Sequence, residues 1–123
     1  MPYSEDDGLH VVVETATFIA QCDRLGVGEG VRAWIVDAVA RNPLAGDLMV
    51  GTGGVRKLRV AAPGRGKRGG YRAISYFGGR GMPVFLLTIY AKNEKADLTQ
   101  AERNGLRLLV ARLARTSRPG KGR

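Results

Sequence analysis

Residues 51–72 read GTGGVRKLRVAAPGRGKRGGYR, with seven cations, seven glycines and no acid. Apolar side chains alternate with cations in the first half of this stretch, which predicts a β-strand over residues 54–62. On that strand Lys57 and Arg59 project from one face, about 7 Å apart, and the apolar side chains project from the other. A run of cations is commonly a solvated surface. Seven cations without an acid, interleaved with glycines, instead favour phosphate binding.

The two parts of the chain carry opposite net charge. Residues 1–50 hold eight acids and three cations, a net of −5, and residues 51–123 hold three acids and seventeen cations, a net of +14, which together give the +9 of the chain. This asymmetry predicts a polyanionic partner for the C-terminal part. A length of 123 residues with 44% hydrophobic residues indicates one domain with a substantial core.

The single cysteine and the single histidine limit the chemistry. Cys22 cannot form an internal disulfide, which fits a reducing cytosol, and we expect it to pack as a small hydrophobic residue. We expect His10 to be structural. One His and one Cys cannot supply a zinc ligand set, so no metal or other cofactor is predicted. Neither a signal-peptide pattern nor an apolar run near the ~20 residues of a membrane span is found, which predicts a soluble cytoplasmic protein without a membrane partner.

The N-terminal part predicts a strand followed by a helix. Residues 1–8 are short and polar, and we expect them to be flexible. The β-branched run at residues 9–13 predicts a strand. A helix then begins after a threonine cap, either Thr15 or Thr17, and ends at Gly26, a residue suited to a left-handed helix terminus.

Apolar periodicity predicts three further elements. A second helix covers residues 29–41, and Trp34 lies on its apolar stripe, where we expect it to be part of the core. Residues 71–77 and 83–90 read as strands joined by a glycine-rich hairpin turn. The second of these, PVFLLTIY, is the most apolar run of the chain, so we expect it to be the central strand of the sheet.

The loop between the two basic strands, residues 63–70, contains the letters of a GxGxxG motif. A dinucleotide fingerprint must open a helix after a strand, and here the motif leads into another strand, which excludes that reading. The loop also lacks the Ser or Thr of a nucleotide-binding P-loop. Its glycines and cations are better interpreted as a clamp on a phosphate backbone, formed by Arg65, Lys67 and Arg68.

The C-terminal part predicts a helix and a tail. Thr99 and Glu102 form a capping box that starts the helix, and Arg103 is expected on its solvated side. Residues 116–123 read as a basic disordered tail. The predicted order is β-α-α-β-β-β-α, an α+β fold in which a mainly antiparallel sheet packs against helices within one domain, residues 9–115.

Three motifs resemble the RelE/HigB-type toxins of bacterial toxin–antitoxin modules, a family within the RelE/ParE superfamily. They are GTGGVRKLRV, GxGKxGGYR and IYAKNEKADLTQAER, and the resemblance extends over about residues 14–113. It implies a RelE-like fold and a metal-independent mRNA endonuclease that acts on the 70S ribosome and inhibits translation. It also implies a cognate antitoxin, with a helix-turn-helix DNA-binding domain, as partner. Members of the family cut mRNA by attack of a ribose 2′-OH on the adjacent phosphate.

The resemblance also assigns site residues. Arg59 and Arg72 would stabilise negative charge on the reacting phosphate, and Lys57 would position the phosphate or transfer a proton. Tyr90 and Lys92 stand nearest to the remaining catalytic positions of the family, although Tyr90 could equally be a strand-end aromatic packed on the core. Further contacts to RNA are predicted for Arg56, Arg65, Lys67, Arg68 and Asn93.

Two other functions remain open from the sequence. ParE-type toxins share the predicted architecture and poison DNA gyrase without nuclease chemistry. The dense basic face favours RNA cleavage, because binding to gyrase does not require it. A basic RNA-binding domain without activity is the third reading. The low aromatic content of 7% weakens it, since such domains usually stack bases on exposed rings.

Overall fold

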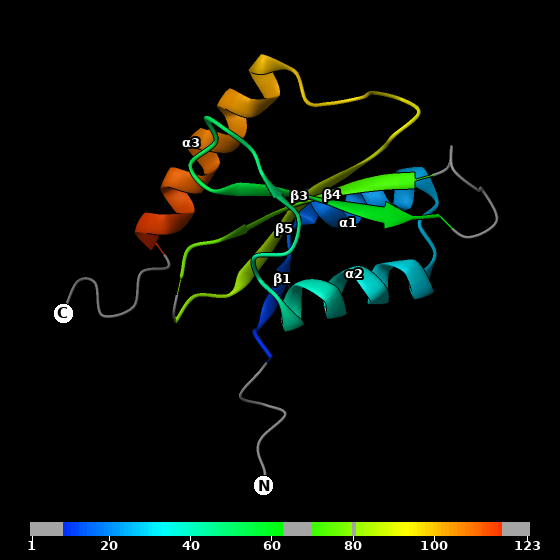
Figure 1. Ribbon diagram of the computed structural model, residues 1–123, viewed down its shortest axis with the longest axis horizontal. Helices are drawn as coiled ribbons and strands as arrows, with labels where there is room; N and C mark the ends of the chain where they lie inside the picture. The colour runs from blue at the N-terminus through cyan, green and yellow to red at the C-terminus, as the bar shows by residue number, and fades with distance from the viewer. Residues whose placement is uncertain (1–8, 63–69, 80, 117–123) are drawn as a thin grey trace, which may run out of the picture.

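The computed structural model describes residues 9–62, 70–79 and 81–116, which form a five-stranded sheet with helices on both faces (Figure 1). The predicted α+β class is confirmed. The elements in chain order are β1 (Val12–Glu14), α1 (Ala16–Leu25), α2 (Glu29–Arg41), β2 (Asp47–Leu48), β3 (Val55–Ala61), β4 (Gly70–Phe77), β5 (Val84–Ala91) and α3 (Gln100–Thr116).

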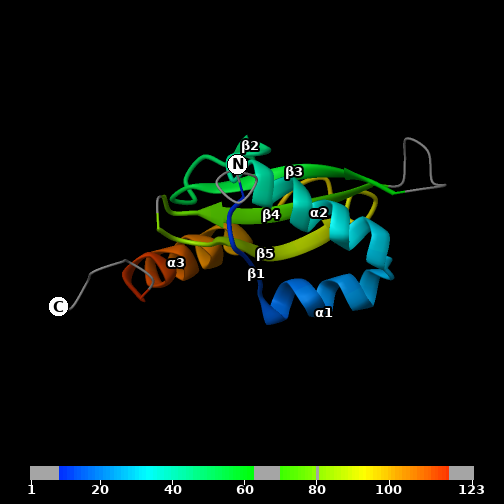
Figure 2. The same cartoon turned by 90° about the horizontal axis from the view of Figure 1, so that it is seen from below.

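The sheet is mixed, with the strand order β1-β5-β4-β3-β2 (Figure 2). β1 pairs with β5 in parallel, and every other pair is antiparallel. The prediction that residues 83–90 form the central strand is therefore wrong. β5 is an interior strand between β1 and β4, and β4 occupies the middle because a hairpin partner lies on each side of it.

One hydrophobic core lies between the sheet and the first two helices. Helix α1 contributes Phe18 and Cys22, and α2 contributes Ile35 and Val39, all of them at most 1% exposed. Burial raises the pKa of the Cys22 thiol, as expected for a cysteine that packs as an apolar side chain. Both predictions for this layer, a packed Cys22 and a second helix over residues 29–41, are confirmed.

The second core lies on the opposite face, under α3. The predicted capping box is present: Glu102 accepts a hydrogen bond from the backbone N–H of Thr99, whose hydroxyl accepts one from the N–H of Glu102. Val110 of α3 packs against side chains such as Val55 and Tyr76, which lie where β3 begins and β4 ends. Helix α3 thus covers one end of this face (Figure 1). The other end carries the polar side chains described below.

A β-bulge in β5 changes which of its side chains face α3. Ser75 of β4 pairs with Leu86 and Ile74 pairs with Thr88, so Leu87 is an extra residue in β5. Phe85 and Leu87 belong to the core under α3, and strict alternation would place Ile89 there as well. Instead Ile89 faces α1 and α2, and Tyr90 turns to the α3 face.

Some local predictions were wrong. The first strand covers residues 12–14 rather than 9–13, and the two-residue strand β2 was not predicted because it is too short for a periodic pattern. Helix α3 extends to Thr116, the first residue of the predicted tail. The expectations for residues 1–8 and 117–123 lie outside the described residues.

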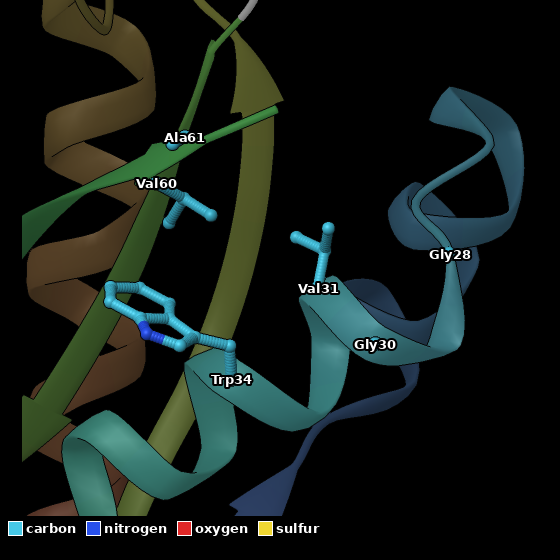
Figure 3. A pocket seen from close by; sticks show the side chains of 6 residues that line it. All are labelled: Gly28, Gly30, Val31, Trp34, Val60 and Ala61. Carbon is cyan, nitrogen blue, oxygen red and sulfur yellow. The ribbon is translucent and has the colours of Figure 1, made fainter. Parts of the chain in front are cut away.

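Trp34 was expected in the core but is 51% exposed. It lies at the margin of the apolar stripe of α2, beside Val60 of β3 (Figure 3). Strand β2 pairs with Arg56 and Lys57 of β3, and within the described part of the chain no other strand extends the sheet outward beneath the indole.

Candidate active site

Three of the predicted site residues form a row across the sheet. Arg59 of β3 lies directly opposite Arg72 of β4, and Arg72 lies directly opposite Tyr90 of β5. Directly opposed residues of an antiparallel pair project from the same face, and neighbouring strands lie about 4.8 Å apart. Lys57 precedes Arg59 by two positions and projects from this face as well. We call these four residues, Lys57, Arg59, Arg72 and Tyr90, the basic row.

Local sequence explains why Lys57 and Arg59 of β3 face away from the core under α1 and α2. Val55 and Val60 are buried on opposite faces, the first under α3 and the second under α1 and α2. Leu58 and Val60 hold one face of the strand against α1 and α2, which leaves Lys57 and Arg59 on the other, as the alternation predicted. Where α3 does not cover it, this face is open to solvent and can accommodate charged side chains.

The two arginines of the basic row have no acidic partner within the described part of the chain. Arg59 is exposed, and Arg72 is half-buried, with its Nη1 donating to the carbonyl of Tyr71 at 3.2 Å. A guanidinium without an intramolecular carboxylate retains its capacity to bind phosphate oxygens, two at a time in the bidentate geometry. This pair can therefore concentrate positive charge on a phosphate that approaches the sheet.

Tyr90 is a buried member of the row. It is 3% exposed, and its hydroxyl has no hydrogen-bond partner among the described residues. Burial is the main cause that raises its pKa, and the Asp97 charge acts in the same direction, against the opposing effect of Arg72. The hydroxyl therefore keeps its proton at neutral pH and can donate it or share it in a hydrogen bond. The ammonium of Lys95 lies 5.5 Å from the centre of the ring, a cation–π distance.

Sequence reasoning missed an acidic member of the site, Asp97. Its carboxylate is 3.4 Å from Nζ of Lys57 and 3.0 Å from Nη2 of Arg103, and it accepts a hydrogen bond of 2.8 Å from the backbone N–H of Leu98. That hydrogen bond and the two cations hold the pKa of Asp97 below its ordinary value. Arg103, which was expected on the solvated side of the helix, is half-buried and forms this ion pair.

The remaining predicted residues are dispersed. Arg56 projects from the opposite face of β3, with its Nη1 donating to the carbonyl of Gly46 at 3.1 Å. Lys92 and Asn93 are exposed in the turn that follows β5, and the backbone N–H of Lys92 donates to Gly70. The predicted phosphate clamp of Arg65, Lys67 and Arg68 lies outside the described residues.

In residues 9–62, 70–79 and 81–116, no three His, Cys, Asp or Glu side chains group in a way that could hold a metal ion. None of the helices described is long and apolar enough to cross a bilayer.

A hollow of about 570 Å³ lies between α2 and β3 and is lined by Gly28, Gly30, Val31, Trp34, Val60 and Ala61 (Figure 3). In Figure 3 the side chains of Val31, Trp34 and Val60 border this space. None of these described lining residues carries an ionisable group. Because Val60 and Arg59 project from opposite faces of β3, the hollow and the basic row lie on different sides of the sheet.

The fold and the site together define a small α+β protein that presents paired arginines on the end of a mixed sheet that α3 leaves uncovered. A family model described as the RelE toxin of the RelE/RelB toxin–antitoxin system matches residues 35–120. The match covers 86 of the 123 residues, from 120 − 35 + 1, and includes the whole basic row. The chain belongs to the RelE toxin family.

Proposed function

We propose that the protein is a ribosome-dependent mRNA endonuclease that acts in the cytoplasm as the toxin of a toxin–antitoxin module. The observation that supports this function best is the row Arg59–Arg72–Tyr90, in which two arginines without an acidic partner among the described residues lie beside a hydroxyl that keeps its proton. Cleavage of RNA without a metal requires positive charge around one phosphate and a group that supplies a proton. The two arginines offer the charge on paired strands of the sheet, and Tyr90 offers a proton from a buried position beside Arg72.

In the proposed reaction the ribose 2′-OH gives its proton to a base, either Lys57 or a water molecule, and the 2′-oxygen forms a bond to the adjacent phosphorus, while the bond from phosphorus to the 5′ oxygen breaks. The leaving 5′ oxygen gains a proton, and the products are a cyclic 2′,3′-phosphate and a 5′-hydroxyl. Arg72 and Arg59 stabilise the charge that develops on the phosphate oxygens. Tyr90 is proposed as the proton donor, because it lies directly opposite Arg72 in the row and its hydroxyl has no hydrogen-bond partner among the described residues.

Lys57 is proposed to position the phosphate or to transfer a proton. Lys92 and Asn93 follow β5 in an exposed turn, where they are placed to contact RNA that extends beyond the row. Arg56 is a weaker candidate for such a contact, because it lies on the other face of β3 and is engaged with Gly46.

The test is primer extension on a defined mRNA with purified ribosomes, with and without the protein. Discrete breaks within codons that require the ribosome would support the proposal. Intact mRNA together with gyrase-dependent DNA breaks would instead support the ParE-like function. If the protein binds RNA but neither RNA nor DNA is broken, the result would support an RNA-binding domain without nuclease activity.

The cognate antitoxin is proposed to neutralise the toxin by covering the basic row with an acidic segment. The charge of the C-terminal part supports this mode. The alternative is an apolar antitoxin segment in a groove beside the first two helices, and the hollow at Trp34 adjoins α2. Hydrogen exchange on the complex decides between them. We expect the antitoxin to protect amides of β3 and β4 from exchange. Protection confined to residues 15–41 would contradict the proposal that the antitoxin covers the basic row.

A further inference from the structure

The strongly basic part of the chain contains few acids, and all of them lie in one segment. Residues 51–123 hold three acidic side chains, Glu94, Asp97 and Glu102, within the connection from β5 to α3 and the first turn of that helix. Each one is paired with a cation. Glu94 binds Arg24 of α1 through both oxygens, at 2.9 and 3.1 Å, and Glu102 binds Lys95 at 2.6 Å. These two pairs fix the ends of the connection where it runs over the α3 face of the sheet.

The third acid, Asp97, is the one that contacts the basic row. Lys57 and Asp97 are forty positions apart in sequence, so this contact exists only in the folded chain. Asp97 is itself held by Leu98 and Arg103, and Nη1 of Arg103 donates to the carbonyl of Val50 at 3.3 Å. The carboxylate is thus held in place by Leu98 and by Arg103, which is itself bound to the turn before β3. Lys57 is its contact with the basic row.

We propose that Asp97 is a positioning residue that holds the ammonium group of Lys57 at its place in the basic row. The inference rests on the proposed nuclease function. A lysine has a flexible four-carbon stem and loses considerable rotamer freedom when its head is fixed. An anchored carboxylate fixes that head before RNA binds, so less ordering is required in the transition state.

A different role for Asp97 makes the opposite prediction. The carboxylate of Asp97, between Lys57 and Arg103, resembles a bound phosphate. In this second role it would act as a stand-in, meaning an intramolecular anion that occupies the phosphate site until RNA displaces it. Removing a stand-in would strengthen RNA binding and raise turnover together. Removing a positioning residue would also strengthen binding, because an anion leaves a basic face, but it would lower turnover. The direction of the change in turnover therefore separates the two roles.

The test compares Asp97→Asn with the matched control Asp37→Asn. Asp37 pairs with Arg41 on α2, on the opposite side of the sheet, so the control makes the same change in charge away from the site. For Asp97→Asn we expect turnover on ribosome-bound mRNA to fall on the order of 10-fold, with tighter binding to a single-stranded oligonucleotide. Asp97→Glu should recover part of the turnover. A rise in turnover, or no change in it, would overturn the proposal.

Two further measurements show whether Asp97 acts through Lys57. In a Lys57→Ala background, Asp97→Asn should have no additional effect on turnover, because the group that it positions is gone; an additive loss would overturn the proposal. NMR relaxation of the Lys57 side chain should show a restrained ε-carbon in the wild type and a mobile one in Asp97→Asn. This readout needs no substrate. If the wild type does not cut mRNA, the proposed function fails, while an unchanged Lys57 order parameter would overturn the positioning role by itself.

Discussion

At the scale of single residues, Arg72 is the best placed to act on a phosphate. It lies between Arg59 and Tyr90 in the row, on the middle strand of the sheet. Its backbone is therefore paired on both sides, and its planar guanidinium can contact two phosphate oxygens at once, which an ammonium cannot do in the same geometry. A group that stabilises a developing charge must be held in place and aimed at that charge. The paired backbone and the guanidinium of Arg72 meet this requirement.

Replacing Arg72 with Ala should lower the rate of mRNA cleavage by about 10²–10³, the usual cost of losing one preorganised charge stabiliser. Arg72→Lys should recover only part of the rate. Single-turnover kinetics on ribosome-bound mRNA measures both effects, with Arg107→Ala, an exposed cation on α3, as the control. Full toxicity of Arg72→Ala in cells, at matched protein levels, would contradict the proposed mechanism.

The acid Asp97 should also make stability depend on pH. Its pKa in the folded protein is lowered, chiefly by the Leu98 N–H and also by Lys57 and Arg103, whereas in the unfolded chain it has the ordinary value of about 3.9. A lowered folded pKa means that the contribution to stability is complete above the unfolded pKa and is lost as pH falls through the folded pKa. In urea denaturation at about pH 6, the wild type should have a larger free energy of unfolding than Asp97→Asn. This difference should become smaller below about pH 4. A gap that widens in acid would contradict this assignment.

At the scale of elements, Thr15 connects the first helix to the bulge that orients Tyr90. Its hydroxyl caps α1 by accepting from the N–H of Phe18 at 3.2 Å. The same hydroxyl lies 2.9 Å from the carbonyl of Leu86 and 3.1 Å from that of Leu87, the extra residue of β5. A bulge leaves backbone groups outside the regular ladder, so a side chain that satisfies them stabilises the irregular geometry.

Thr15→Ala should therefore destabilise the protein by about 1–2 kcal/mol, since it removes both a helix cap and a partner of the bulge carbonyls. Thr17→Ala is the matched control. The sequence alone allowed either threonine as the cap, but Thr17 is exposed within α1 and should contribute less than about 0.5 kcal/mol. Urea denaturation followed by circular dichroism measures both values. Equal losses for the two variants would exclude the special role of Thr15.

At the scale of the whole molecule, the two faces of the sheet differ in charge. Helices α1 and α2 on one face carry three acids and three arginines, which balance: Asp23, Glu29 and Asp37 against Arg24, Arg32 and Arg41. The cations of the basic row lie on the other face. The described helices of the first face are therefore neutral in sum, whereas the basic row gives the second face positive charge, and this difference orients an approaching polyanion toward the row.

Binding to RNA should accordingly be strongly dependent on salt. If about five cations contact phosphates, the logarithm of the binding constant should fall with the logarithm of salt concentration with a slope near −3.5 for a single strand. Arg59→Ala should reduce the magnitude of the slope by about 0.7, because one phosphate contact is lost, and Asp37→Asn should leave it unchanged. Fluorescence anisotropy with a labelled oligonucleotide measures the slope, and a nearly flat response would contradict the phosphate-binding face.

The sequence by itself determined the features that depend on local periodicity. The alternation in residues 54–62 placed Lys57 and Arg59 on one face, and the capping box at Thr99 located the start of α3, because strand alternation and helix capping involve only neighbouring residues. Only the tertiary structure decided the rest. The register of β3, β4 and β5 aligned Arg59, Arg72 and Tyr90, and the bulge turned Tyr90 to their face. Folding also brought Asp97 to Lys57 and left Trp34 at an uncovered margin. These features depend on pairing between residues distant in sequence, which no local pattern encodes.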